Sequence, residues 1–215
     1  MARTWSETPA TIVFALASTI VSALLFLTGF EQLGIFAGGV IPARLSGLAD
    51  LPAAVTVVPV WLTPLTATLV HAGWAHLAFN MVSLLYTGTQ SERALGSPGL
   101  VVLYVVGAIA AGLAQWLAAP DSMAPMVGAS GAISAVIAAY ALLYGNQRTA
   151  RAIGPFSARV VHIAWLAAAW IGINLLFGFV GSQSGMPIAV AAHIGGFLAG
   201  LALARPLLLW RWRAA

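Results

Sequence analysis

The chain has 215 residues, of which 61% are hydrophobic and only 7% are charged, and its mean hydropathy is +0.97. Soluble domains carry about 25% charged residues, so this composition excludes an ordinary soluble protein and indicates an integral membrane protein. All nine basic residues are arginine, and in so apolar a chain we attribute them to membrane orientation rather than to nucleic acid binding. The absence of cysteine excludes disulfides, thiolate chemistry and cysteine-ligated zinc.

Six apolar stretches are long enough to cross a bilayer, whose hydrocarbon core of about 30 Å needs roughly 20 apolar residues per helix. They are residues 10–30, 66–87, 99–119, 124–144, 160–180 and 187–210. The first is longer than the apolar part of a signal peptide, so we expect it to be a retained helix. Residues 31–65 form a long, half-apolar connection with several Gly and Pro, and we expect part of it to lie in the membrane interface. The pattern predicts an all-α protein with a single membrane domain over residues 1–215.

Arginine is divided unevenly between the two sides that six spans define. One side carries both termini and eight arginines, namely Arg3, Arg93, Arg148, Arg151, Arg159, Arg205, Arg211 and Arg213. The opposite side carries only Arg44. Because positively charged loops stay in the cytoplasm, we expect both termini to be cytoplasmic. The second, fourth and sixth helices then begin on the outer side.

Polar residues collect where these three helices begin. The stretches are "HAGWAHLAFN" with His71, His76 and Asn80, "GASG" with Ser130, and "AAHIGGFLAG" with His193. Polar side chains inside a membrane are costly and usually face a bundle interior or a wet cavity, which makes each a candidate for a functional role. His76 and Asn80 are four residues apart and therefore project from one helix face.

Small residues indicate how two of these helices could meet. Gly196 and Gly200 form a G-x-x-x-G pair in the sixth helix, and Gly131 begins a similar row of small residues in the fourth. Such faces allow close backbone approach, which would bring His193, three residues before Gly196, to Ser130. Taken alone, Ser130 is compatible with a role as one more small packing residue. Paired with an imidazole, its hydroxyl would be a nucleophile with its general base.

Donors for the oxyanion of a tetrahedral intermediate are also present in this region. The side chains of His76 and Asn80 would each supply one, and Ser130, at the start of a helix, has a free backbone N–H. Together with the hydroxyl and imidazole, these donors indicate acyl-transfer chemistry.

The three motifs together resemble the rhomboid intramembrane serine proteases. The resemblance rests on H-x-x-x-x-H-x-x-x-N in the second helix, G-A-S-G at the start of the fourth and A-H-I-G-G-x-x-x-G in the sixth, and it includes "IPARL" in the long first connection. It implies a six-helix rhomboid-like bundle. The roles it implies are Ser130 as nucleophile, His193 as base, His76, Asn80 and the Ser130 backbone N–H as oxyanion hole, Gly128 as the leading glycine of the serine motif, and His71 as a structural residue.

The resemblance further implies a serine endopeptidase that cuts transmembrane-anchored proteins near the outer membrane boundary, without a metal or cofactor. A helical peptide bond must unwind before attack, so substrates with Gly or Pro near that boundary are favoured, since these residues weaken helices by about 1 and 3 kcal/mol. We expect a multi-pass protein of a bacterial plasma membrane whose site opens outward. Its partners would be transmembrane substrates and the lipid bilayer, and its oligomeric state is left open.

Two positions depart from the family pattern. Trp61 is not followed by the Arg that often accompanies it, and Ser134 stands where many members have an aromatic ring that stacks on the catalytic imidazole. The acidic candidates on the outer side, Asp50 and Asp121, both fall in loops, so we expect a Ser–His dyad without a carboxylate. Glu92 falls in the cytoplasmic connection after the second stretch, where we expect a structural role.

The sequence leaves other functions open. A rhomboid-like processing enzyme dedicated to one sorting signal on exported proteins would share the same catalytic residues. A non-catalytic rhomboid-like protein that binds transmembrane clients would be expected to lack Ser130 or His193. A transporter that relays protons would be expected to carry acidic residues within its spans, and the six stretches contain none.

The arginine distribution predicts a topology that reporter fusions can test. A fusion at residue 150 is expected to report the cytoplasm, and fusions at residues 45 and 184 are expected to report the outside, because eight of nine arginines lie on one side. The reverse pattern would contradict the placement of the polar cluster near the outer surface.

Overall fold

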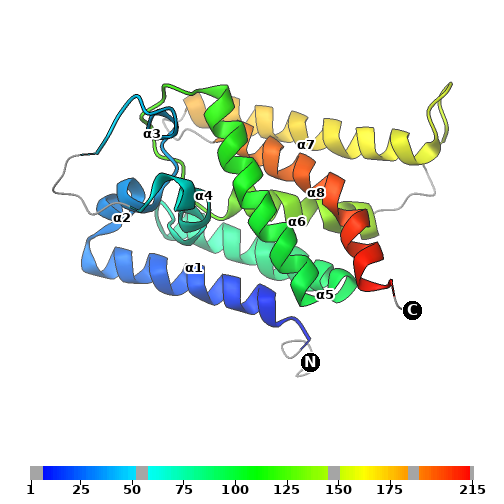
Figure 1. The fold of residues 1–215 in the computed structure, drawn as a ribbon, viewed down its shortest axis with the longest axis horizontal. Coiled ribbons are helices and arrows are strands. Elements are labelled where there is room, and N and C mark those ends of the chain that lie inside the picture. Colours follow the sequence, from blue (N-terminus) through cyan, green and yellow to red (C-terminus); the bar gives the residue numbers. More distant parts are fainter. Residues whose placement is uncertain (1–6, 52–57, 145–150, 184–188, 214–215) are drawn as a thin grey trace.

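A computed structural model describes residues 7–51, 58–144, 151–183 and 189–213. The helices are α1 (Pro9–Thr28), α2 (Glu31–Gly38), α3 (Pro42–Leu45), α4 (Thr63–Thr66), α5 (Trp74–Ala118), α6 (Ser130–Tyr144), α7 (Ala158–Gln183) and α8 (Val190–Arg211), with 3-10 turns η1 (Val60–Leu62) and η2 (Ala67–Leu69). Over the described ranges the only extended pairings are two isolated bridges, so the predicted all-α class is confirmed. Figure 1 shows the long helices packed side by side.

Four of the described helices, α1, α5, α7 and α8, are long and apolar enough to cross a membrane. The 45-residue helix α5 is in fact two arms, because Gly96 has a φ of 75° and a ψ of 162° that no helix accommodates. Pro98 follows in the first turn of the second arm, where its missing N–H costs nothing. Helix α6 has 15 residues and is shorter. This set of helices is that of a multi-pass integral membrane protein.

Two predicted helix starts are wrong. The helix expected from residue 66 begins at Trp74, because Val70 is extended and Gly73 has a φ of 91°, which ends the short turns that precede it. The helix expected from residue 124 begins at Ser130, because Met126 pairs with Val40 in an extended bridge. Both stretches are apolar enough for a membrane span, but turns or extended backbone precede each helix.

Arginines lie at both ends of the molecule. Helix α1 begins and α8 ends at the right-hand end of Figure 1, whereas α2 and α3 lie at the left-hand end, where Arg44 is found. Arg93 and Arg211 belong to the right-hand end, and the Arg211 guanidinium donates to the backbone carbonyls of Glu92 and Arg93 beside the break in α5. Arg3, Arg148 and the fusion positions 150 and 184 lie outside the described residues.

Glu92 lies inside α5 and not in a loop as expected from the sequence. Its buried carboxylate accepts hydrogen bonds from the backbone N–H groups of Ala10 and Thr11, at 2.9 and 2.8 Å, and from the Thr11 hydroxyl at 2.7 Å. The Ser97 hydroxyl adds a fourth at 2.7 Å. The carboxylate therefore caps the start of α1 and ties it to the break between the arms of α5.

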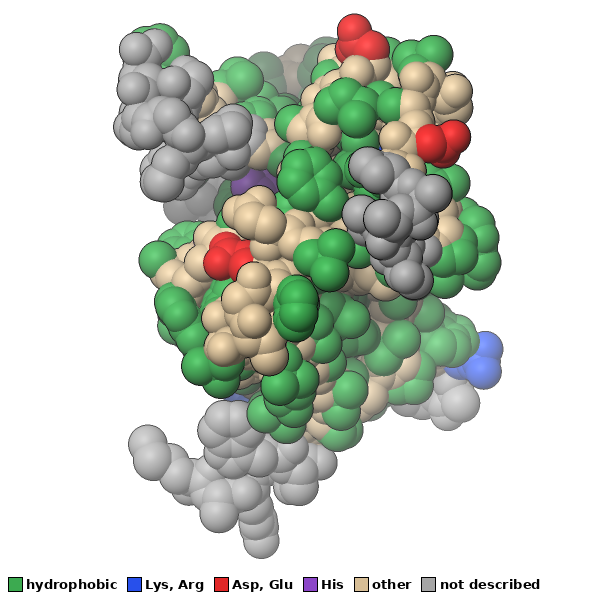
Figure 2. All heavy atoms as spheres, turned by 90° about the vertical axis from the view of Figure 1, so that its left-hand side faces the viewer, with side chains coloured by type: hydrophobic (Ala, Val, Ile, Leu, Met, Phe, Trp, Pro, Cys, Tyr) green, Lys and Arg blue, Asp and Glu red, His purple; other side chains and the backbone are tan. Residues whose placement is uncertain are grey.

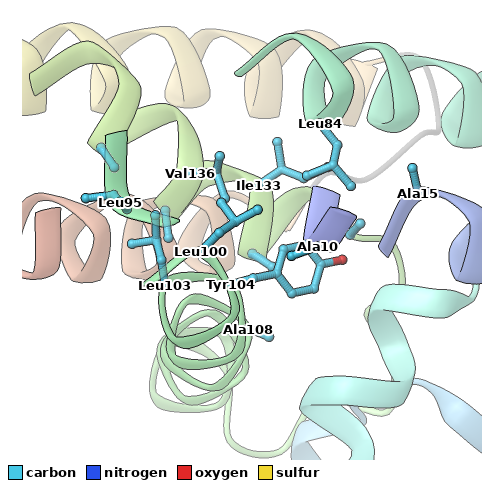
Figure 3. Close-up of a cluster of buried hydrophobic side chains, with 14 of the residues drawn as sticks. Ala10, Ala15, Leu84, Leu95, Leu100, Leu103, Tyr104, Ala108, Ile133 and Val136 are labelled. Atoms are coloured by element: carbon cyan, nitrogen blue, oxygen red, sulfur yellow. The ribbon is translucent and has the colours of Figure 1, made fainter. Parts of the chain in front are cut away.

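The apolar core is shared by α1, α5, α6 and α8 (Figure 3). Leu100, Leu103 and Val136 are almost completely buried in it, and Tyr104 stacks on Phe14 with ring centroids 4.1 Å apart. Helix α7 is different, since few of its side chains are buried, and it packs chiefly on α8. Helices α5 and α8 therefore pack closely on α6, while α7 lies at the edge of the group.

Candidate active site

The segment that leads into α6 is held by residues between α2 and α5. Val40 and Met126 exchange backbone hydrogen bonds of 2.9 and 2.8 Å, and the Gly128 N–H donates to the Ala67 carbonyl at 2.8 Å. The Ala129 N–H donates to Nε2 of His71 at 3.3 Å. Buried backbone outside helices needs partners for its polar groups, and residues between α2 and α5 provide them here. The position of Ser130 is fixed by these bonds.

His71 is fully buried and has a defined tautomer. The Ser22 hydroxyl donates to the Leu69 carbonyl at 2.9 Å, so its oxygen accepts from Nδ1 of His71 at 3.0 Å. With its hydrogen on Nδ1, the imidazole presents a lone pair on Nε2 to the Ala129 N–H. His71 thus links α1 to the segment that leads into α6, as expected of a structural residue.

Ser130 and His193 come together where α6 and α8 begin. Nε2 of His193 lies 2.7 Å from Oγ of Ser130, and both residues are half-buried. A Cβ added to Gly196 would meet the Gly131 carbonyl oxygen, and one added to Gly200 would meet the backbone of Ala135. The small-residue faces of the two helices are therefore in direct backbone contact. Ser130, directly before Gly131, and His193, three residues before Gly196, are brought together by this contact.

The second ring nitrogen of His193 has a partner that the sequence analysis missed. Nδ1 lies 2.7 Å from Oδ1 of Asn174, which is buried on α7. Asp50 and Asp121 are exposed in the loops after α3 and α5, so neither carboxylate takes this place. Asn174 is a polar residue within a predicted span, and the rule that singled out Asn80 would have found it.

His76 lies against the backbone of the serine motif. Gly128 has a φ of 109°, and a Cβ placed on it would lie 2.6 Å from Cε1 and 2.7 Å from Nε2 of His76. Nδ1 of the same ring accepts the Ala72 N–H at 3.4 Å, which leaves the ring hydrogen on Nε2, the nitrogen that faces the motif. His76 therefore presents its Nε2–H donor beside Gly128, which is two residues before Ser130 in the chain.

Asn80 lies one turn further along α5 and is buried. Its Nδ2 donates to the His76 carbonyl at 2.9 Å, and since an amide nitrogen carries two hydrogens, one donor is left. Ser134 is also buried, and its hydroxyl donates to the Ser130 carbonyl at 2.7 Å. The short side chain at position 134 lets α8 approach, since a Cβ on Gly196 would lie 3.4 Å from Cβ of Ser134.

The arrangement offers a hydroxyl, an imidazole within hydrogen-bond reach of it, and donors on the neighbouring helix. Figure 2 views the end of the molecule that carries α2 and α3, and part of a histidine side chain is visible there, set back from the surface. This constellation fits nucleophilic attack on a carbonyl with general-base assistance.

Comparison with known proteins gives a consistent picture. A family model described as "Rhomboid domain" matches residues 59–210. Rhomboid protease GluP of Bacillus subtilis is 35% identical over 148 residues, which are 68% of this chain and 27% of that protein. Rhomboid protease GlpG of Yersinia pestis is 33% identical over 135 residues, 62% of this chain and 44% of that protein. Rhomboid-like protein 11, chloroplastic, of Arabidopsis thaliana is 31% identical over 150 residues, 67% and 52% of the two chains. The aligned parts thus span about a quarter to a half of these relatives.

The contact between Gly128 and His76 can be tested by stability measurements. Gly128→Ala is expected to lower the free energy of unfolding in detergent by about 2–4 kcal/mol, from its positive φ and from overpacking against the ring. Gly47→Ala is the matched control, because Gly47 also has a positive φ, of 66°, but has nothing within 4 Å of its added Cβ. It is expected to cost only about 1–2 kcal/mol.

A His76→Ala background should remove the collision and bring the cost of Gly128→Ala close to that of the control. Equal losses for Gly128→Ala and Gly47→Ala in the native background would contradict the placement of the His76 ring.

Proposed function

The chain belongs to the rhomboid family, and we propose that it is an intramembrane serine endopeptidase in which Ser130 is the nucleophile and His193 the general base. The observation that carries this proposal is the 2.7 Å hydrogen bond between Oγ of Ser130 and Nε2 of His193, placed on two membrane helices. An imidazole in that position removes the proton that makes a serine hydroxyl a weak nucleophile.

The reaction follows from the positions of these groups. Oγ of Ser130 attacks the carbonyl carbon of the substrate while its proton passes to Nε2 of His193. The tetrahedral oxyanion accepts hydrogen bonds from Nε2–H of His76, the free N–H of Asn80 and the backbone N–H of Ser130. The imidazolium then protonates the leaving amine as the C–N bond breaks. A water molecule, deprotonated by the same nitrogen, hydrolyses the acyl-enzyme and regenerates the hydroxyl.

The proposed topology has six membrane crossings with both termini in the cytoplasm. The two arms of α5 and the shorter α6 supply three of the crossings, and α1, α7 and α8 supply the others. The position of Arg93 and Arg211 at the end where α1 begins supports this orientation under the positive-inside rule. Ser130 and His193 then lie near the outer surface, where water for the hydrolytic step has the shorter path.

The substrates we propose are transmembrane-anchored proteins cut near the outer boundary of a bacterial plasma membrane. The names of the Bacillus and Yersinia relatives support both the protease activity and the bacterial setting. A non-catalytic client-binding role is less well supported, since it gives no reason for a hydroxyl and an imidazole to be hydrogen-bonded at 2.7 Å.

Substitution of the two serines on α6 tests the nucleophile. Ser130→Ala is expected to abolish cleavage of a model transmembrane substrate in proteoliposomes, because the attacking oxygen is removed. Ser134→Ala is the matched control, one helical turn away, and should keep initial rates within about threefold, since its hydroxyl donates only to a backbone carbonyl. His193→Ala should reduce the rate nearly as far as Ser130→Ala.

The oxyanion donors are expected to contribute less than the nucleophile and base. His76→Ala and Asn80→Ala each remove one donor and should slow cleavage by roughly 10–100-fold, somewhat below the 10²–10³ seen for such donors elsewhere, because the remaining donors stay in place. Folded Ser130→Ala protein that still cleaves, or His76→Ala and Asn80→Ala proteins that both match the wild type, would overturn these assignments.

A further inference from the structure

We propose that Asn174 on α7 is a positioning residue that fixes the tautomer and the ring orientation of His193. This inference rests on the proposed function, in which Nε2 of His193 takes the proton of Ser130. It adds a third member to the pair that the sequence analysis expected to act alone.

The direction of every hydrogen bond in this chain of groups can be deduced. The Trp170 carbonyl can only accept, so the group of Asn174 that lies 2.9 Å from it is the amide NH₂. The carbonyl oxygen Oδ1 therefore faces Nδ1 of His193, at 2.7 Å. Because an amide oxygen also can only accept, the imidazole hydrogen resides on Nδ1.

The tautomer of His193 determines the direction of its hydrogen bond with Ser130. A neutral imidazole with its hydrogen on Nδ1 has a lone pair on Nε2, and that nitrogen lies 2.7 Å from Oγ of Ser130. The Ser130 hydroxyl must then donate to Nε2, which is the arrangement needed for proton removal. The opposite tautomer would set the Nδ1 lone pair against Oδ1 of Asn174 and leave the serine proton without this acceptor.

The burial of Asn174 shows that it faces α8. It is 3% exposed, whereas its neighbours Ile173 and Leu175 are 47% and 58% exposed. Nε1 of Trp170 donates to the His193 carbonyl at 3.4 Å, and the Trp170 ring stacks on Phe197 with centroids 5.0 Å apart. Helix α7, otherwise little buried, thus contacts α8 around His193.

An amide suits this position for an electrostatic reason. In water-soluble serine hydrolases a carboxylate orients the base, but an unpaired carboxylate inside a membrane carries a large desolvation cost. A neutral amide accepts the same hydrogen bond at a far lower cost. His76 of α5 is uncharged in the tautomer deduced above, since its Nδ1 accepts the Ala72 N–H.

The tautomer can be measured directly in the wild-type protein. With ¹⁵N-labelled histidine and His193→Gln as the assignment control, NMR in micelles at a pH where the ring is neutral should show His193 protonated on Nδ1 and not on Nε2. A wild-type His193 that carries its hydrogen on Nε2 would overturn the proposal, whatever the activity of the protein.

Kinetics of three variants test the effect on the base. Asn174→Leu is expected to lower kcat by about 10–100-fold with KM within about twofold, and to add the Nε2–H form to the NMR spectrum. Asn174→Asp keeps an acceptor for Nδ1–H but loses the donor to the Trp170 carbonyl and adds a buried charge, so its kcat should lie above that of Asn174→Leu and below that of the wild type. Trp170→Phe is the matched control on α7, since it loses only the bond to the His193 carbonyl and keeps the stacked ring; its kcat should stay within about threefold.

A folded Asn174→Leu protein with wild-type kcat, or one in which Nδ1–H remains the only form, would contradict the proposal. So would equal losses for Asn174→Leu and Trp170→Phe, because that result would assign both to helix packing. Failure of the proposed function would be recognised separately, as cleavage that survives Ser130→Ala.

Discussion

The backbones of α6 and α8 touch at Gly131 and Gly196 and again at Ala135 and Gly200, and the geometry of the site depends on this contact. Lipid tails are as apolar as leucine, so close van der Waals packing, rather than the hydrophobic effect, holds membrane helices together. Glycine permits that packing because it has no Cβ. Ser130 lies directly before the first contact and His193 three residues before Gly196, so the same packing sets the distance between hydroxyl and imidazole.

Hydrogen bonds from neighbouring groups set the tautomer of each histidine at the site. Each of the three histidines around the start of α6 has a tautomer set by its neighbours: Nδ1–H in His71, Nε2–H in His76 and Nδ1–H in His193. A buried polar group left unsatisfied is costly, which favours these assignments. Three similar side chains thereby acquire different properties, one as a structural link, one as a donor and one as an acceptor toward Ser130.

The all-α class and the membrane character were predictable from sequence, because hydropathy reflects transfer into lipid directly, and four of the described helices are long and apolar enough to cross a membrane. The sequence predicted the Ser130–His193 juxtaposition from the spacing of His193 to the G-x-x-x-G pair, since small residues at helical spacing define a contact face. It could not predict that α5 begins at Trp74, because residues 66–73 are as apolar as the helix and only their backbone conformation differs. The burial of Glu92 and the role of Asn174 depend on contacts with α1 and α8, which spacing within one helix does not reveal.

The proposed chemistry requires that Ser130 is a nucleophile activated by His193. The most direct measurement is mass spectrometry of the folded protein after reaction with a fluorophosphonate, which forms a covalent bond only with an activated serine. One adduct per chain is expected, located by peptide mapping at Ser130 and lost in the His193→Ala protein. An adduct at another serine, or a protein that cleaves substrate yet remains unlabelled, would contradict this chemistry.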